Sequence, residues 1–169
     1  LQAHANNRIR YTRWRTEWVL YLYKVFIEWS SPVLRRRGPY RRGSVRGMGE
    51  MTTFPSNGHT CDGYLAGDGT GPGVIVIQEW WGLVPHIKDV ADRFAAAGFA
   101  ALAPDLYHGK STKEPDEAGK MMMALKMDEA ANDMAGAYDF LKAHPACTGK
   151  VGSVGFCMGG GLSLMIASI

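Results

Sequence analysis

The fold of this chain is decided by one stretch of its sequence, Val151-Gly152-Ser153-Val154-Gly155-Phe156-Cys157-Met158-Gly159-Gly160-Gly161. Residues 150–155 predict a buried strand, and the small and apolar residues from 162 to 169 predict the start of a helix. A cysteine thus stands in a strand–helix turn with glycine two positions to either side, the context of a nucleophile elbow. Glycine is expected there because side chains flanking so tight a turn would clash.

Cys157 is the candidate nucleophile in this turn. A thiol at a helix N-terminus is favoured as the thiolate by the helix dipole and by unpaired N–H groups. The backbone N–H of Met158 would point at an oxyanion developing on the substrate. The alternative is an inert structural cysteine in a glycine-rich turn. The strand before Cys157 and the helix after it favour the nucleophile.

Outward from this turn, strands and helices alternate from about residue 51. Strands are expected at residues 74–77, 99–103 and 150–155, and helices at 85–97 and 130–141. Residues 113–125 are expected to form a loop leading into a helix, and 52–73 a turn-rich stretch with a short strand near 62–66. This order predicts an α/β protein with a mostly parallel sheet and helices on both faces.

Glu79 ends the first buried strand, at the carboxyl edge of the expected sheet, where ligands bind in open α/β folds. A carboxylate there could accept the thiol proton or orient the cysteine. A solvated glutamate, or one that caps the next helix, is an equally good interpretation of position alone. Trp80 and Trp81 follow and could line an apolar pocket or simply belong to the core.

Three motifs occur in register along the chain: Gln78-Glu79-Trp80-Trp81-Gly82, Ala103-Pro104-Asp105-Leu106-Tyr107 and Gly155-Phe156-Cys157-Met158-Gly159-Gly160. Together they resemble the dienelactone hydrolase (carboxymethylenebutenolidase) family over about residues 52–169. The resemblance implies an α/β-hydrolase fold, a three-layer sandwich that this chain would contain incompletely at its C-terminal side. It also implies a Cys-His-Asp triad that hydrolyses a small-molecule lactone or ester without a cofactor or metal.

The resemblance assigns roles residue by residue. Cys157 matches the family nucleophile, and Glu79 matches the glutamate that helps activate the thiol. The backbone N–H groups of Trp80 and Met158 match the oxyanion hole. Tyr107, together with Trp81, is the expected substrate-binding pair, and it ends the second motif.

Two positions depart from the family pattern. Better-known members have an Arg two residues after the tyrosine, where this chain has Gly109, so the broader hydrolase class is expected rather than dienelactone itself. No Asp, Glu or His follows Cys157, so the triad Asp and His are absent from this chain. His108 and His86 are weak substitutes. We therefore expect a fragment of a longer product, unstable alone, with little hydrolysis and a monomeric state at full length.

The N-terminal residues differ in composition from the rest. Residues 1–47 carry 11 Lys and Arg against 2 Asp and Glu, and the whole chain has a net charge of +3. We expect residues 1–50 to be a basic, aromatic extension outside the working domain at 51–169. A membrane-surface segment, a nucleic-acid-binding segment or a transit peptide are the alternatives for this extension.

The three cysteines, Cys61, Cys147 and Cys157, form no disulfide framework and no zinc motif, and free thiols fit a reducing cytoplasmic setting. Neither a nucleic-acid nor a membrane partner is expected for the hydrolase domain. A second hypothesis is a non-catalytic α/β module that binds a small molecule or senses oxidants through Cys157. A third hypothesis is a protein tethered to a membrane or to nucleic acid, whose active part is the N-terminal extension.

Overall fold

The computed structural model describes residues 49–68 and 70–168, so the expected extension at 1–50 lies, except for its last two residues, outside the described residues. The strands are β1 (Glu50–Ser56), β2 (His59–Ala66), β3 (Gly71–Ile77), β4 (Ala100–Pro104) and β5 (Cys147–Gly155). The helices are α2 (Pro85–Ala96), α3 (Pro115–Ala124), α4 (Met127–Ala143) and α5 (Met158–Ile166). The expected division of the chain at residue 50 remains a prediction.

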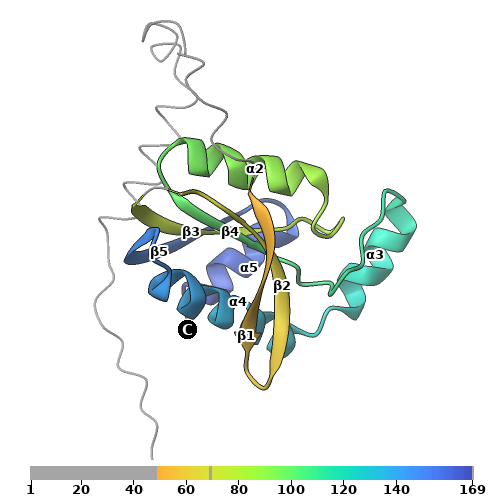
Figure 1. The fold of residues 1–169 in the computed structure, drawn as a ribbon. Helices are drawn as coiled ribbons and strands as arrows, with labels where there is room; N and C mark the ends of the chain where they lie inside the picture. The colour runs from red at the N-terminus through yellow and green to blue at the C-terminus, as the bar shows by residue number, and fades with distance from the viewer. Residues whose placement is uncertain (1–48, 69, 169) are drawn as a thin grey trace, which may run out of the picture. The chain divides into compact units, whose positions relative to one another are not determined.

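The five strands form one mixed sheet in the order β1-β2-β4-β3-β5. β3 runs parallel to both β4 and β5, while β2 runs antiparallel to β1 and β4. The β-branched run in β3 is buried on both faces, as expected for a central parallel strand. The carboxyl ends of β3, β4 and β5 therefore meet at one edge of the sheet (Figure 1).

A β-hairpin corrects the expectation that residues 52–73 are mainly turns. β1 and β2 pair in register from Glu50↔Leu65 to Ser56↔His59, which leaves Asn57-Gly58 as a two-residue turn. Both turn residues have positive φ, 30° and 95°. Asn-Gly is the preferred sequence for such a turn because both residues tolerate this conformation. The hairpin signal was therefore present in the sequence.

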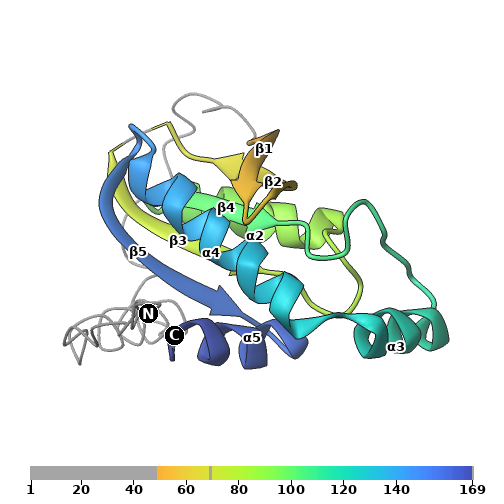
Figure 2. The same ribbon diagram turned by 90° about the horizontal axis from the view of Figure 1, so that it is seen from below.

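Helices cover both faces of the sheet, as expected (Figures 1 and 2). On one face, Ile87, Val90 and Ala91 of α2 pack with Val74 and Val76 of β3. On the other face, apolar side chains of α4 and α5 pack with the opposite sides of the strands. The buried members of this second core include Phe54, Ile75, Ile77, Leu102, Met134, Ala137, Leu141 and Leu162.

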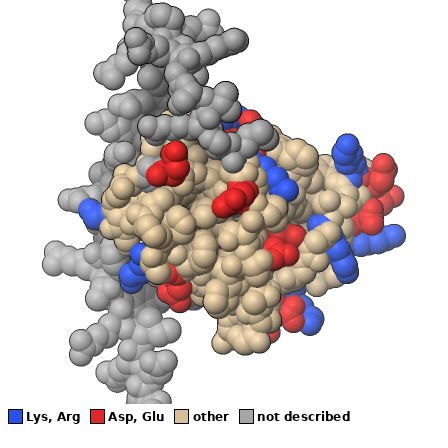
Figure 3. All heavy atoms as spheres, viewed as in Figure 1, with Lys and Arg blue, Asp and Glu red and all other residues tan. Residues whose placement is uncertain are grey.

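The expected helix ends are confirmed at α2, which begins with Pro85 and is followed by Gly98 at φ 94°. Among the described helices, none is long and apolar enough to cross a membrane. Lys, Arg, Asp and Glu side chains are mixed around α3, and the described part of the face in Figure 3 shows no single-sign charged surface.

Candidate active site

Three loops meet at the carboxyl edge of the parallel strands. They follow β3, β4 and β5, and they carry Glu79, Tyr107 and Cys157 respectively. Ile77 pairs with Gly155 at the ends of β3 and β5. Glu79 and Cys157 each lie two residues beyond that pair, so the parallel register brings both to the same edge of the sheet.

The turn that holds Cys157 has the geometry of a nucleophile elbow. Cys157 has φ 54° and ψ −122°, a conformation that a residue with a side chain adopts only under constraint. A Cβ on Gly155 would lie 2.2 Å from the carbonyl oxygen of Gly159. A Cβ on Gly159 would lie 2.6 Å from the carbonyl oxygens of Ile77 and Gln78. Both glycines are therefore required by close backbone contacts, as the sequence pattern predicts.

The thiol of Cys157 is exposed and stands at the N-cap of α5. The carbonyl of Cys157 accepts a hydrogen bond from the N–H of Gly160 at 3.0 Å, which starts the helix. The first N–H groups of a helix have no intrahelical partner, so the N–H of Met158 is available to a substrate oxygen. The contact of Gly159 with the end of β3 brings this helix start beside the loop that carries Glu79 and Trp80.

The loop after β3 is anchored at its far end. Trp81 accepts a hydrogen bond through its carbonyl from the N–H of Thr112 at 3.1 Å, and Gly82 forms a bridge with Ser111. The rings of Trp80 and Trp81 are half-buried, 5.0 Å apart and inclined by 69°. Glu79 is half-buried as well. Within residues 49–68 and 70–168, no hydrogen bond or ion pair joins Glu79 to Cys157.

The loop after β4 is held by two side chains. The carboxylate of Asp105 accepts hydrogen bonds from the N–H groups of Tyr107, at 3.2 Å, and Gly109, at 2.7 Å. The buried amide oxygen of Gln78 accepts one from the N–H of Leu106 at 3.1 Å. The Gln78 bond fixes the loop to the end of β3, so the second and first sequence motifs are joined in the structure.

Tyr107 lies beside the elbow. Its hydroxyl is 3.4 Å from the sulfur of Met158, and its side chain is buried. Burial raises the pKa of Tyr107, and the electrostatic effect of nearby Cys157 raises that pKa further. The structure thus brings together Tyr107, Met158 and Cys157.

None of the histidines in the described part of the chain is joined to Cys157. His59 and His108 contact the carboxylate of Asp133, and the ring of His144 accepts a hydrogen bond from the N–H of Ala146. His86 is exposed at the start of α2. The absence of a triad histidine from this chain stays a prediction.

The structure brings His59 and His108 together, with their rings 5.9 Å apart, a contact that the sequence did not predict. Asp133, which is fully buried between these histidines, is not among the predicted site residues either. One sequence feature could have indicated this cluster: Asp133 is a charged residue on the apolar face of α4, one position before buried Met134.

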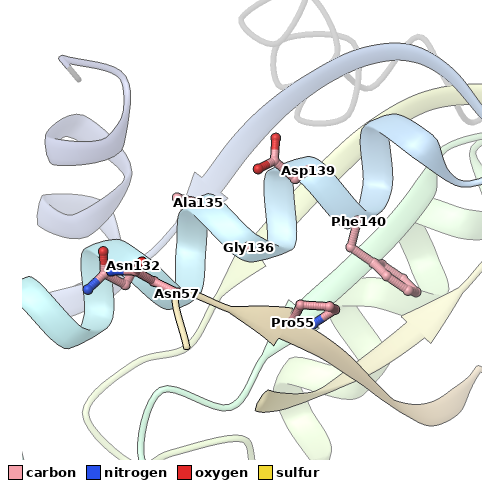
Figure 4. A pocket seen from close by; sticks show the side chains of 7 residues that line it. All are labelled: Pro55, Asn57, Asn132, Ala135, Gly136, Asp139 and Phe140. Carbon is pink, nitrogen blue, oxygen red and sulfur yellow. The ribbon is translucent and has the colours of Figure 1, made fainter. Parts of the chain in front are cut away.

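A groove of about 620 Å³ lies between the β1–β2 hairpin and α4, away from the expected catalytic residues (Figure 4). Its lining residues are Pro55, Asn57, Asn132, Ala135, Gly136, Asp139 and Phe140. None of these residues is among those expected to carry the chemistry.

Comparisons with known proteins agree with the motifs. A model of the dienelactone hydrolase family matches residues 61–169. Protein usf of Aquifex pyrophilus is 46% identical over 128 residues, which cover 71% of this chain and 55% of that protein. A putative carboxymethylenebutenolidase of Aquifex aeolicus (strain VF5) is 40% identical over 132 residues, covering 72% and 56%. The chain thus spans about half the length of these curated relatives.

Solved structures show the same relationship. The putative dienelactone hydrolase from Klebsiella pneumoniae subsp. pneumoniae MGH 78578 superposes with a TM-score of 0.63 at 26% identity, over 71% of this chain and 54% of that one. The dienelactone hydrolase-like phosphotriesterase P91 from metagenomic libraries gives 0.60 at 29% identity, over 72% and 54%. These structures confirm the expected α/β-hydrolase fold. The chain belongs to the dienelactone hydrolase family.

Proposed function

We propose that this chain carries the nucleophilic part of a hydrolase that cleaves small lactones or esters through Cys157. The observation that carries the proposal is the exposed Cys157 thiol at a positive-φ strand–helix elbow, with Tyr107 close by. Membership of the dienelactone hydrolase family supports it. A cytoplasmic location, and a monomeric state for the full-length protein, remain predictions.

In the proposed reaction, the Cys157 sulfur attacks the carbonyl carbon of the substrate as the carboxylate of Glu79 accepts the thiol proton. The carbonyl π electrons move to oxygen, where the N–H groups of Trp80 and Met158 donate hydrogen bonds to the oxyanion. As the carbonyl re-forms, the bond to the leaving oxygen breaks, and that oxygen takes up the proton held by Glu79. For an ester, this step leaves a thioester on Cys157 and releases an alcohol. For a lactone, the new hydroxyl, or the enol of an enol-lactone, stays attached to the acyl group on Cys157.

Hydrolysis of the thioester needs a base that activates water. In the described residues, no histidine is joined to Cys157, so nothing there matches the general base of a complete triad. We therefore expect the 169-residue chain to be acylated once and to turn over slowly. Gly109, in place of the family arginine, favours substrates whose binding does not depend on a carboxylate at that position.

The test is acylation of the purified 169-residue chain with p-nitrophenyl acetate. We expect release of one nitrophenolate per chain and a mass increase of one acetyl group located on Cys157. Cys157→Ala should abolish both signals. Cys147→Ala is the matched control, because Cys147 is half-buried in β5 and lies outside the elbow, and it should keep both. A burst that persists in Cys157→Ala, or no burst in the unmodified chain, contradicts the proposal.

A further inference from the structure

Three side chains with metal-binding atoms converge outside the Cys157 site. His59 opens β2 just after the hairpin turn, His108 stands in the loop after β4, and Asp133 lies on the buried face of α4. The Nε2 atom of His59 is 3.0 Å from Oδ1 of Asp133, and Nε2 of His108 is 3.2 Å from Oδ2. One potential ligand atom from each residue lies within 4.8 Å of the other two. We propose that these three residues bind one divalent transition-metal ion of the zinc class.

The burial of Asp133 is the first argument for a cation. Its carboxylate is fully buried, and a buried negative charge is costly unless a positive charge or several hydrogen bonds compensate it. In the described part of the chain its ion-pair contacts are the two histidines, and no lysine or arginine reaches it. A divalent ion would compensate this charge directly.

The geometry around Oδ2 is the second argument. Oδ2 of Asp133 is buried and has no hydrogen-bond partner among the described residues, although Nε2 of His108 is only 3.2 Å away. This is the arrangement of two atoms that point at a shared ion and not at each other, whereas Nε2 of His59 and Oδ1 of Asp133 are in hydrogen-bond contact at 3.0 Å. Tetrahedral ligands at zinc bond lengths are separated by about 3.3 to 3.4 Å. The two histidine nitrogens lie 3.0 and 3.2 Å from different oxygens of the carboxylate, and one atom from each residue lies within 4.8 Å of the other two, so the three side chains must draw closer to share one ion.

The rest of the structure holds the three residues in place. The hydroxyl of Ser56 donates a hydrogen bond to Oδ1 of Asp133 at 2.6 Å, which orients the carboxylate in the way that supporting residues orient metal ligands. A Cβ on Gly136 would lie 2.4 Å from the carbonyl oxygen of Pro55, so this glycine allows α4 to approach β1 closely. Asp133 lies one turn before Gly136 and therefore reaches the hairpin.

The backbone of His108 is held in the left-handed region, with φ 50°. The carboxylate of Asp105 fixes this turn by accepting hydrogen bonds from the N–H groups on both sides of His108. The same turn therefore directs Tyr107 to the elbow and His108 to Asp133. A metal ion at His108 would stabilise this turn, and through it the position of Tyr107.

The ligand set indicates the class of ion. Two imidazole nitrogens and one carboxylate oxygen suit zinc and neighbouring first-row ions more than calcium or magnesium, which prefer oxygen alone. The side chains of His59 and His108 are 43% and 44% exposed, so water could complete the coordination from the solvent side. The competing explanation is a metal-free network in which each imidazole N–H donates to the carboxylate.

The test is zinc binding by the complete 169-residue chain after treatment with a chelator, followed by calorimetry and thermal unfolding. We expect one ion per chain, a rise in Tm on adding Zn²⁺ and, with Co²⁺, the visible absorption of a low-coordinate nitrogen and oxygen site. The His59→Ala and His108→Ala variants should each weaken zinc binding by at least about tenfold. Both residues are partly exposed, so these variants should fold even if Asp133→Asn does not.

Matched controls separate this site from other ligands. His86→Ala and His144→Ala remove histidines outside the cluster and should leave zinc affinity unchanged. The Cys147→Ala/Cys157→Ala double variant removes the more accessible thiols and should also bind one ion. No binding by the unmodified chain overturns the proposal and favours the metal-free network. Undiminished binding by His59→Ala and His108→Ala, or loss of binding in the double cysteine variant, overturns it as well.

Discussion

The hydroxyl of Tyr107 lies 3.4 Å from the sulfur of Met158, the residue that directly follows Cys157. This contact joins the loop after β4 to the start of α5, two segments that are about fifty residues apart in the sequence. It places a buried hydroxyl donor against the residue next to Cys157, near the proposed position of a carbonyl substrate. We therefore propose that Tyr107 contacts the substrate, and a single variant can test this role.

Tyr107→Phe should slow acylation of Cys157 by about fivefold, the equivalent of about 1 kcal/mol for one hydrogen bond to the substrate. Stability should change little, because sulfur is a weak acceptor and the ring remains. The rate of acylation by p-nitrophenyl acetate and the Tm measure the two effects. Tyr138→Phe, in α4, is the control and should change neither. An unchanged rate in Tyr107→Phe would exclude a substrate contact through its hydroxyl.

Gly159→Ala should destabilise the protein by about 1 to 3 kcal/mol, because the added methyl meets two carbonyl oxygens at the end of β3. Acylation of Cys157 should fall as well, since the elbow must shift. Gly161→Ala lies two residues further along α5 and has nothing within 4 Å of the added methyl. That variant should be stabilised by up to about 1 kcal/mol, because alanine favours a helix interior. Chemical denaturation distinguishes the pair, and equal effects would argue against the close packing of Gly159.

Much of the fold follows from local patterns in the sequence. The apolar run at residues 74–77 predicts β3, and the spacing around Cys157 predicts the elbow, since both depend on neighbouring residues alone. The Asn57-Gly58 hairpin was missed although its turn signal is local. The cluster of His59, His108 and Asp133 depends instead on contacts between residues far apart in the sequence. Its histidines reach Asp133 only through packing of the hairpin, the β4 loop and α4, which sequence spacing does not encode.

The three cysteines should react with iodoacetamide in order of accessibility. Cys157 is exposed, Cys147 is half-buried, and Cys61 is fully buried with its pKa raised to about 12 by burial. Because the thiolate is the reactive form, Cys157 should be alkylated first at neutral pH and Cys61 last. Peptide mapping by mass spectrometry gives the order. The denatured chain is the control, in which the three rates should converge, and early alkylation of Cys61 in the folded chain would contradict the described burial.

The raised pKa of Cys61 also predicts a loss of stability in alkaline solution. Its pKa is about 12 in the folded protein against an ordinary value of 9.0, with burial the main cause and the charge of Asp133 the next. Above about pH 9 the unfolded chain loses this proton while the folded chain keeps it. Ionisation then favours the unfolded state by about 1.4 kcal/mol for each pH unit until about pH 12. Below about pH 9 both states hold the proton, and Cys61 adds no pH dependence.

Cys61→Ala isolates this effect because other alkaline titrations are common to both proteins. The variant should be less stable at pH 7, owing to a small cavity, by an amount that does not depend on pH. Between pH 7 and about pH 10.5 the unmodified chain should lose about 2 kcal/mol more than the variant. Urea unfolding at a series of pH values, with freshly reduced protein, measures the difference. Cys147→Ala is the matched control and should follow the unmodified chain, whereas parallel pH profiles for the unmodified chain and Cys61→Ala would show that Cys61 ionises normally.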